Sequence, residues 1–285
     1  LGLFEAYING EKAGDDLLAP FLNDYTEHFQ YCTYDVTSLL AEDNTLSVLL
    51  GDGWYRGHFG LGEPTHYDRP LALIAELRME FADGHRENLC SDSGWQYHGS
   101  FTTLSDIYNG ETQDYTKAPG GWKQPVLIPA PGRLCDRYSS PLHYMESISV
   151  KEVIHTPAGE TVLDFGQNFA GHVICIQPLP KGTTMTLEFG EVLQNGNFYH
   201  ENYRHAESKF TYVSDGIHRE IRPRFTFFGF RYVKISGLER VDAACFEGRA
   251  IYSEMDRTGF IRTGNEKINR LFSNSLWGLK SNFLD

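Results

Sequence analysis

Apolar and polar residues alternate along most of the chain in short runs, which are separated by Gly, Pro, Asn and Asp. Residues 1–13 alternate around Asn9-Gly10, a dipeptide that favours the positive backbone angles of a tight hairpin turn. The same pattern predicts further strands at residues 31–36, 45–50, 71–81, 147–155, 160–165, 172–179, 183–193, 209–214, 223–235 and 244–253. Many short strands with frequent turns are typical of β-sandwiches and jelly rolls, so the sequence predicts an all-β fold.

Two segments interrupt the strand pattern. Residues 116–141 are rich in proline and glycine, as in a segment that crosses between two sandwiches or in a long edge loop. We predict a crossing, with a first β-sandwich at residues 1–140 and a second at residues 141–258. Near the end of the chain, apolar side chains recur at helical spacing, at Ile268, Leu271, Phe272, Leu276, Leu279 and Phe283. Asn265 is placed to cap this helix, which either lies on the second sandwich or begins a further domain.

Composition narrows the classes of function. The formal net charge of −13 and the lack of Lys/Arg clusters argue against a nucleic-acid partner and favour neutral substrates. The chain lacks a run of about 18 apolar residues, so no membrane span is predicted. Five dispersed cysteines without zinc-type spacing predict mostly buried thiols and no metal ligand. They favour a reducing, cytoplasmic compartment, although one disulfide stays open.

The motifs of common enzymes do not occur. The chain contains no GxSxG, HExxH or P-loop motif, and no GxGxxG between a strand and a helix. His and carboxylate residues are plentiful but lack a recognisable spacing. We therefore predict no catalytic residue from local motifs.

The loop GDGWYRGHFG (residues 51–60) follows a predicted strand and gathers polar and aromatic side chains. Loops at the ends of sandwich strands bind sugars by stacking a pyranose face on an aromatic ring and hydrogen-bonding its hydroxyls. Asp52, Trp54 and Arg56 are therefore the candidate carbohydrate-binding residues. The alternative is structural: Trp54 plugs the end of the sandwich, and Arg56 pairs with a neighbouring acid.

Residues 191–212 form a polar excursion that is longer than a hairpin needs. Such loops either carry function or dock on a neighbouring domain, and we prefer docking. The candidate domain-interface residues are Glu191, Glu201, Asn202 and Arg204.

Two more clusters have structural interpretations. Asn109-Gly110 predicts a turn within residues 105–115, where Glu111 and Asp114 either bind a ligand or decorate a hairpin. In residues 224–232, Phe225, Phe227 and Phe230 are predicted core residues, while Arg224 and Arg231 reach acids across the sheet.

Eight segments together resemble bacterial α-L-rhamnosidases of glycoside hydrolase family 78, in the same order and over nearly the whole chain. They are AYINGEKAGDDLLAPFLNDY, YCTYDVTSLL, NTLSVLLGDGWYRG, SDIYNGETQDY, VLDFGQNFAGH, EFGEVLQNGNFYHENYRHAESKFTYV, PRFTFFGFRYVKISG and SEMDRTGFIRTGNEKINRLFSNSLWGLKSNFLD. The sequence departs from the family where Phe21-Leu22 replaces Gly-Trp, where His172 replaces Trp and where Phe228 replaces His. These departures concern local packing.

The resemblance implies two jelly-roll or galactose-binding-like β-sandwiches ahead of an (α/α)₆ barrel that removes terminal α-L-rhamnose with inversion. Inversion needs two carboxyl groups roughly 6.5–9.5 Å apart. Both lie in the barrel of the family, so the resemblance implies no catalytic residue here, Asp285 included. It also implies that an opening strand precedes Leu1 and that residues 259–285 form a linker helix into the barrel.

The sequence thus predicts a non-catalytic accessory region of an α-L-rhamnosidase. The expected partners are a rhamnosylated glycan or glycoside and the catalytic barrel of the same polypeptide. No cofactor is predicted, although a structural or sugar-bridging calcium stays open. In this interpretation Asp164, Gln167 and Asn168 of LDFGQNFAGH satisfy backbone groups at a turn or a domain junction. The rivals are a stand-alone carbohydrate-binding module for rhamnose-containing glycans, and a chain that hydrolyses glycosides itself.

Overall fold

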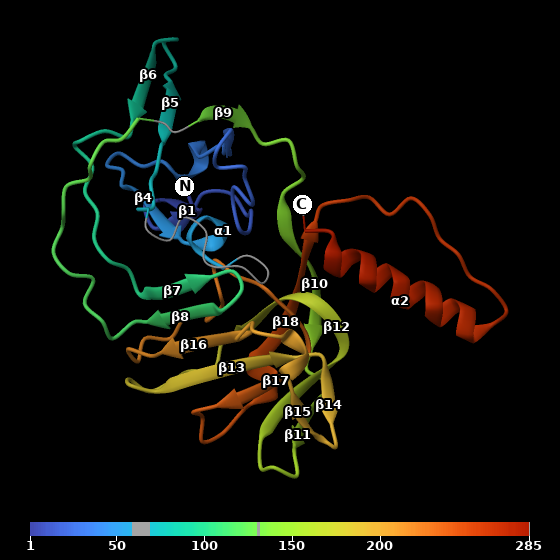
Figure 1. Ribbon diagram of the computed structural model, residues 1–285. Helices are drawn as coiled ribbons and strands as arrows, with labels where there is room; N and C mark the ends of the chain where they lie inside the picture. Colours follow the sequence, from blue (N-terminus) through green and yellow to red (C-terminus); the bar gives the residue numbers. More distant parts are fainter. Residues whose placement is uncertain (59–68, 130–131, 285) are drawn as a thin grey trace.

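The computed structural model describes residues 1–58, 69–129 and 132–284, and Figure 1 shows strands throughout with one long helix near the C-terminus. The strands are β1 (Leu3–Ile8), β2 (Glu11–Lys12), β3 (His28–Tyr31), β4 (Leu46–Gly51), β5 (Glu76–Glu80), β6 (Arg86–Cys90), β7 (Thr102–Asp106), β8 (Gly110–Asp114), β9 (Arg133–Asp136), β10 (Leu142–Ser149), β11 (Glu152–His155), β12 (Thr161–Cys175), β13 (Thr184–Gly190), β14 (Val192–Gln194), β15 (Asn197–Tyr199), β16 (Lys209–Val213), β17 (Phe228–Ser236) and β18 (Phe246–Ser253). The helices are α1 (Gly53–Arg56), α2 (Glu266–Asn282) and the 3₁₀ turns η1 (Thr37–Leu39), η2 (Glu201–Tyr203) and η3 (Ala243–Cys245). The predicted all-β class is confirmed.

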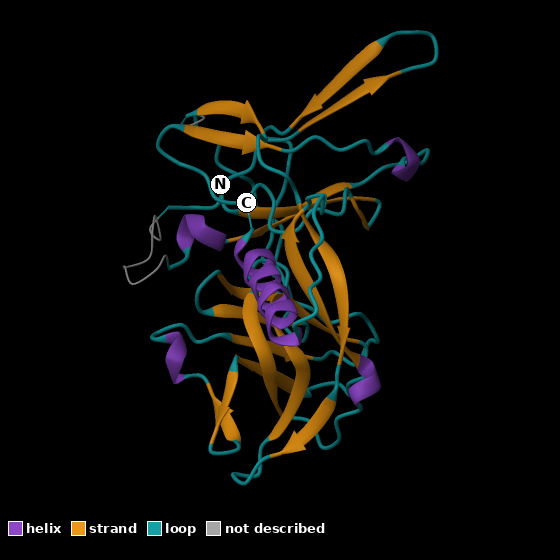
Figure 2. Ribbon diagram, turned by 90° about the vertical axis from the view of Figure 1, so that its right-hand side faces the viewer, coloured by secondary structure: helices purple, strands orange, loops and turns teal. Residues whose placement is uncertain are grey.

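The N-terminal strands form a three-stranded antiparallel sheet in the order β2-β1-β4. The predicted Asn9-Gly10 turn is present, because both residues have positive φ (54° and 84°) and Ile8 pairs with Glu11 across it. Nearby, β3 and β9 pair in parallel. The hairpin of β5 and β6 projects from the body (Figure 2).

A nine-stranded sheet forms the larger part of the molecule. Its order is β10-β18-β12-β17-β13-β16-β8-β7, with β11 paired to β12. The hairpin β7–β8 precedes residue 140 in sequence, yet β8 pairs in parallel with β16 of the later segment. The sheet therefore takes strands from both sides of the predicted boundary at residue 140, and the division into 1–140 and 141–258 stays a prediction.

The two strands predicted at residues 160–165 and 172–179 are one long strand, β12. Its register against β17 shifts between Asp164, opposite Tyr232, and Phe169, opposite Phe230. Four residues of β12, 165–168, thus lie opposite the single residue Arg231 of β17, which is a bulge, and Gly166 supplies a positive φ of 74° there. The stretch LDFGQNFAGH is therefore the bulged interior of one strand and not a turn between two strands.

Two other strands are shorter than predicted, since β5 begins at Glu76 and β17 begins at Phe228. The strand predicted at residues 31–36 is wrong, because β3 covers His28–Tyr31 and residues 32–36 form no strand. β17 begins later than predicted because the backbone N–H groups of Arg224 and Phe225 donate to the Glu111 carboxylate rather than to a neighbouring strand. The carboxylate replaces a sheet partner and ends the ladder.

Two hydrophobic clusters form the core. The larger lies around the nine-stranded sheet and is rich in aromatic rings, including Phe189 stacked on Phe228 with 3.9 Å between centroids. The smaller joins the N-terminal sheet to β10 and β18, and contains Leu3, Leu17, Leu18, Trp54, Leu142, Phe225 and Ile251. The predicted core residues Phe225 and Phe230 are fully buried. Each buried side chain of this kind contributes about 1.5–3 kcal/mol.

Helix α2 begins at the predicted cap, where the Asn265 Oδ1 accepts hydrogen bonds from the N–H groups of Lys267 (2.9 Å) and Ile268 (3.4 Å). The helix contacts β12 and β18, and Trp277 packs against the larger cluster. Among the described residues, no helix combines the length and apolarity that spanning a membrane requires.

The cysteines are free thiols, but they are not mostly buried as predicted. Cys175 is buried in β12, whereas Cys90 is exposed because it ends β6 of the projecting hairpin. Cys32, Cys135 and Cys245 are half-buried.

Candidate functional site

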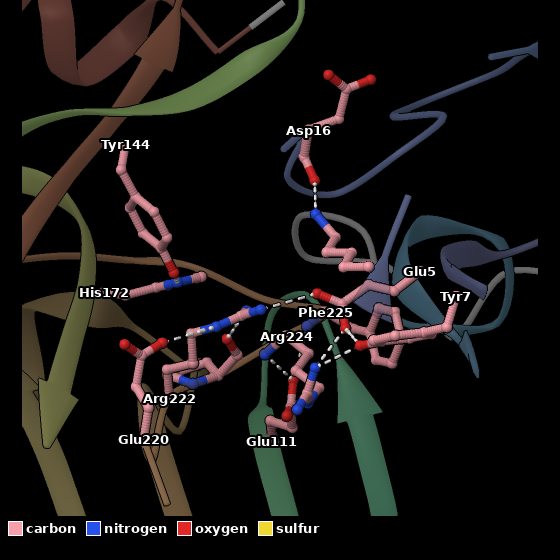
Figure 3. A network of polar contacts seen from close by, with 12 residues as sticks. Glu5, Tyr7, Asp16, Glu111, Tyr144, His172, Glu220, Arg222, Arg224 and Phe225 are labelled. Atoms are coloured by element: carbon pink, nitrogen blue, oxygen red, sulfur yellow. Dashed lines mark hydrogen bonds and ion pairs between the residues drawn. The ribbon is translucent and has the colours of Figure 1, made fainter. Parts of the chain in front are cut away.

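A buried group of charged side chains, here called the junction network, joins the N-terminal sheet to the nine-stranded sheet (Figure 3). Its centre is Glu5 of β1, whose Oε1 lies 3.1 Å from Nη2 of Arg222 and whose Oε2 lies 2.5 Å from Nη1 of Arg224. The Tyr7 hydroxyl donates to Glu5 Oε2 and accepts from Arg224 Nη1 at 2.7 Å. Burial alone would raise the pKa of Glu5, but Arg222 and Arg224 outweigh it and lower that pKa to about 2.

Glu111 of β8 supplies the second carboxylate of the junction network. Its Oε2 accepts from the backbone N–H groups of Arg224 (2.9 Å) and Phe225 (2.7 Å), and its Oε1 accepts from Gln113 Nε2 (2.6 Å). Burial raises the pKa of Glu111. Far from decorating a hairpin, this side chain holds the segment before β17 against β8.

His172 of β12 extends the junction network. Its Nε2 lies 2.6 Å from the Thr226 carbonyl oxygen, and its Nδ1 lies 2.8 Å from the Tyr144 hydroxyl. Burial lowers the pKa of His172 to about 3, so the ring is neutral at ordinary pH. The carbonyl requires the proton on Nε2, and Nδ1 then accepts from Tyr144. His172, which stands where the family usually has tryptophan, is thus buried with a polar partner at each ring nitrogen.

The structure brings Asp52, Trp54 and Arg56 together around helix α1. Arg56 Nη1 lies 3.3 Å from Asp52 Oδ1, and the Ser105 hydroxyl lies 3.4 Å from Asp52 Oδ2. The Trp54 side chain is only 9% exposed, and its ring centroid is 4.4 Å from that of Phe21. Its packing matches the structural alternative. Stacking on a sugar needs an exposed ring face, which Trp54 does not offer in this structure. Sugar binding by this loop stays a prediction. Phe59 and Gly60 of the loop lie outside the described residues.

The predicted excursion contains the hairpin β14–β15 and the turn η2. Glu191 accepts from the Nδ2 groups of Asn168 (2.8 Å) and Asn202 (3.2 Å), and the Tyr203 hydroxyl donates to the Gly229 carbonyl of β17 (2.5 Å). These bonds hold the excursion on the sheet. Asn168 therefore connects the bulge of β12 to the excursion.

Beside η2 lies an open depression of about 410 Å³. It is lined by Glu188, His200, Glu201, Arg204, His205, Ala206, Glu207 and Lys209. Arg204 has a φ of 62°, which is strained for a residue with a side chain. Such strained residues are found more often at functional sites. Glu201 and Arg204 thus share one polar surface, whereas Glu191 and Asn202 bond to each other. Their role in a domain interface stays a prediction.

Asp164, in the bulge of β12, makes a two-pronged ion pair. Its two oxygens each lie 2.8 Å from a guanidinium nitrogen of Arg231, and Oδ1 also accepts from Gly166 N–H at 2.6 Å. Burial opposes ionisation, but Arg231 and Gly166 lower the pKa of Asp164. The prediction that Asp164 satisfies a backbone group is confirmed, as is the reach of Arg231 across the sheet.

Helix α2 presents a second candidate surface. Trp277 and Lys280 face the sheet, and Lys280 pairs with Glu146 of β10. The apolar stripe predicted from the sequence points elsewhere, and its members Ile268, Leu271, Phe272, Leu279 and Phe283 are 42%, 63%, 43%, 50% and 45% exposed. We call these five residues the α2 apolar face.

Sequence reasoning missed the Glu5–Arg222 pairing, because the partners are 217 residues apart. A signal was nevertheless present. Strand alternation puts Glu5 on the same side of β1 as the buried Leu3, and a charged residue in the apolar phase of a strand requires an ionic partner.

Two family descriptions match the chain in order. Residues 1–135 match the α-L-rhamnosidase N-terminal domain, and residues 154–252 match the bacterial α-L-rhamnosidase concanavalin-like domain. Among curated proteins, an α-L-rhamnosidase of Streptomyces avermitilis is 34% identical over all of this chain and 29% of its own length. An α-L-rhamnosidase of an Alteromonas species is 32% identical over all of this chain and 33% of its own.

Solved structures agree with these matches. The crystal structure of the Streptomyces avermitilis α-L-rhamnosidase complexed with L-rhamnose superimposes with a TM-score of 0.93 at 34% identity, covering 99% of this chain and 29% of that one. The α-L-rhamnosidase of Aspergillus terreus gives a TM-score of 0.92 at 32% identity, covering 99% and 35%. The chain thus spans about a third of the length of the relatives that it matches.

Proposed function

Because this chain belongs to the bacterial α-L-rhamnosidase family, we propose that it acts as the accessory β-sandwich region of such an enzyme and does not itself carry the catalytic residues. The observation that carries the proposal is the pair of family matches, which follow one another along a chain about a third as long as the relatives. The reaction of the parent protein would be hydrolysis of terminal α-L-rhamnose.

The state of the buried carboxylates supports a non-catalytic role. Inverting hydrolysis needs one carboxyl group free to protonate the leaving oxygen and another free to activate water. Glu5, Glu111 and Asp164 are instead occupied by arginine side chains or backbone N–H groups. Their bonds hold strands together, which is what a scaffold requires.

We assign the contact with the catalytic region to two surfaces. The α2 apolar face is exposed along a helix whose other side already packs on the sheet, and a contiguous exposed apolar surface is typical of a protein interface. The excursion adds the polar depression that Glu201 and Arg204 line. Apolar surface and hydrogen-bonding groups both occur in contacts between domains.

A ligand titration separates this scaffold from the rival carbohydrate-binding module. The chain is titrated calorimetrically with L-rhamnose and with a rhamnosylated flavonoid, each with and without calcium. The scaffold proposal expects no saturable heat at millimolar sugar. Saturable binding that weakens in Arg56→Ala but persists in the control Arg78→Ala, on the projecting hairpin, would instead establish a sugar-binding loop at α1.

A further inference from the structure

A second cluster of charged side chains lies where the N-terminal segment meets β10. Leu17 and Leu142 form an isolated antiparallel bridge, in which Leu17 N–H donates to the Leu142 carbonyl at 2.9 Å. In an antiparallel pair the next residues face each other, so Asp16 stands opposite His143. Asp15 adjoins them, and one ligand atom from each of the three side chains lies within 4.8 Å of the others.

The distances within this cluster are those of ligands around one ion. His143 Nε2 lies 3.3 Å from Asp15 Oδ1 and 3.3 Å from Asp16 Oδ1. One N–H cannot point at both oxygens, and a charge-assisted N–H···O bond is shorter, about 2.7–2.9 Å. By contrast, a tetrahedral zinc ion with bonds of about 2.0–2.1 Å places neighbouring ligand atoms about 3.3–3.4 Å apart.

The surrounding groups leave these ligand atoms free and orient them. Arg137 Nη1 and the Tyr34 hydroxyl bond to Oδ2 of Asp16, so Oδ1 remains for an ion. The other ring nitrogen of His143 faces Glu254, with 3.9 Å between Nδ1 and Oε2. This separation is longer than a hydrogen bond, so Glu254 places a negative charge behind the ring but does not itself fix the tautomer.

We propose that Asp15, Asp16 and His143 bind a divalent first-row transition-metal ion of the Zn²⁺ class. An imidazole ligand favours such ions over calcium and magnesium, which prefer all-oxygen sites. Three carboxylates, those of Asp15, Asp16 and Glu254, outnumber the two nearby cations Arg137 and Lys12. The Asp15 side chain is 87% exposed and gives the ion a route in, while that of Asp16 is 8% exposed.

A bound ion would tie the segment before Leu17 to the start of β10, next to the smaller hydrophobic cluster. It would therefore stabilise the attachment of the N-terminal segment to the rest of the chain. The sequence predicted no metal ligand, because Asp16 and His143 are 127 residues apart and meet only through the bridge.

The test is calorimetric titration of the 285-residue chain with Zn²⁺ in a buffer that does not chelate metals. We expect saturable binding of one ion per chain, weakened at least ~10-fold in Asp15→Asn and abolished in His143→Ala. Asp15 is exposed, so its variant should fold normally. The matched control is His85→Ala, because His85 contacts Asp83 and Glu87 through different ring nitrogens and cannot place them on one ion. This variant should bind zinc as the unaltered chain does.

A second readout identifies the ligands. Co²⁺ bound in a tetrahedral site should give a visible absorption band, which His143→Ala removes and His85→Ala keeps. The proposal is overturned if the unaltered chain shows no saturable zinc binding. It is equally overturned if Asp15→Asn and His143→Ala bind zinc with unchanged affinity.

Discussion

The nine-stranded sheet packs around aromatic rings, whereas the three-stranded sheet meets it through buried paired charges beside the smaller hydrophobic cluster. Phe169, Phe189 and Phe230 are at most 1% exposed, and their stability contribution comes from apolar surface removed from water. At the junction network Glu5 and Glu111 are also buried, at 4% and 1% exposed, but their contribution depends on charge and on complete hydrogen bonding. We expect the stability of the aromatic core to change little with pH but to fall when a side chain is truncated. The stability of the junction network should fall in both cases.

Truncation within the aromatic core should have the largest effect. Phe230 contacts Phe169, Phe189 and Phe165, with centroids 4.5, 4.9 and 5.6 Å away. We expect Phe230→Ala to lower the free energy of unfolding by about 3–5 kcal/mol, because it leaves a cavity. Urea denaturation followed by circular dichroism measures this. A loss below about 1 kcal/mol would mean that the core collapses around the gap.

Removal of one charge at the junction network should cost somewhat less. Glu5→Gln keeps the size of the side chain but leaves Arg222 and Arg224 without their shared carboxylate, at an expected cost of about 3 kcal/mol. The matched control is Glu207→Gln, which removes an exposed pair with Lys209 and should cost about 0–1 kcal/mol. Equal losses in the two variants would contradict the contrast between buried and exposed pairs.

Three groups of the junction network should contribute to the pH dependence of stability. His172 has a folded-state pKa of about 3 against about 6.5 in the unfolded chain, so its contribution is present above pH 6.5 and is lost as pH falls towards 3. Glu5, with a pKa of about 2 against about 4.3 unfolded, adds a loss below about pH 4.3. The raised pKa of Glu111 acts in the opposite sense, since its protonation favours the folded chain.

Denaturant titrations at a series of pH values measure these contributions. In His172→Gln the loss of stability between pH 6.5 and about 4.5 should largely disappear, while the loss below it remains. An unchanged profile in this variant would assign the acid sensitivity to another group.

The smallest effect should come from the α2 apolar face. Leu271 is 63% exposed, so Leu271→Glu should change the free energy of unfolding by no more than about 0.5 kcal/mol. Trp277→Ala, on the side of α2 that packs against the core, should be clearly destabilising. A large loss in Leu271→Glu would mean that this face already has a partner within the chain.

Local chemistry explains which features could be predicted. The Asn9-Gly10 turn, the Asn265 cap and the burial of Phe225 and Phe230 follow from local sequence, and the structure confirms them. Phe227, predicted as core with them, is only half-buried. The bulge in β12 could not be predicted, because it is defined by pairing with β17. The same holds for the place of β8 beside β16, which joins segments about a hundred residues apart.

The same distinction between local and distant contacts separates the candidate sites that could be predicted from those that could not. Trp54, Asp52 and Arg56 were predicted together because they are close in sequence. Their partners are distant: Phe21 packs on the buried Trp54 ring, and the Ser105 hydroxyl bonds to Asp52. The junction network and the cluster at His143 could not be predicted from the sequence, because each is assembled from distant segments.

The most direct test of the proposed accessory role is a hydrolysis assay of the 285-residue chain with p-nitrophenyl α-L-rhamnoside. The chain is first shown to be folded by circular dichroism, and the assay is run with and without added zinc and calcium. The account predicts release of p-nitrophenol at the rate of the buffer blank under every condition. Turnover above the blank that increases in proportion to the concentration of the chain would contradict it.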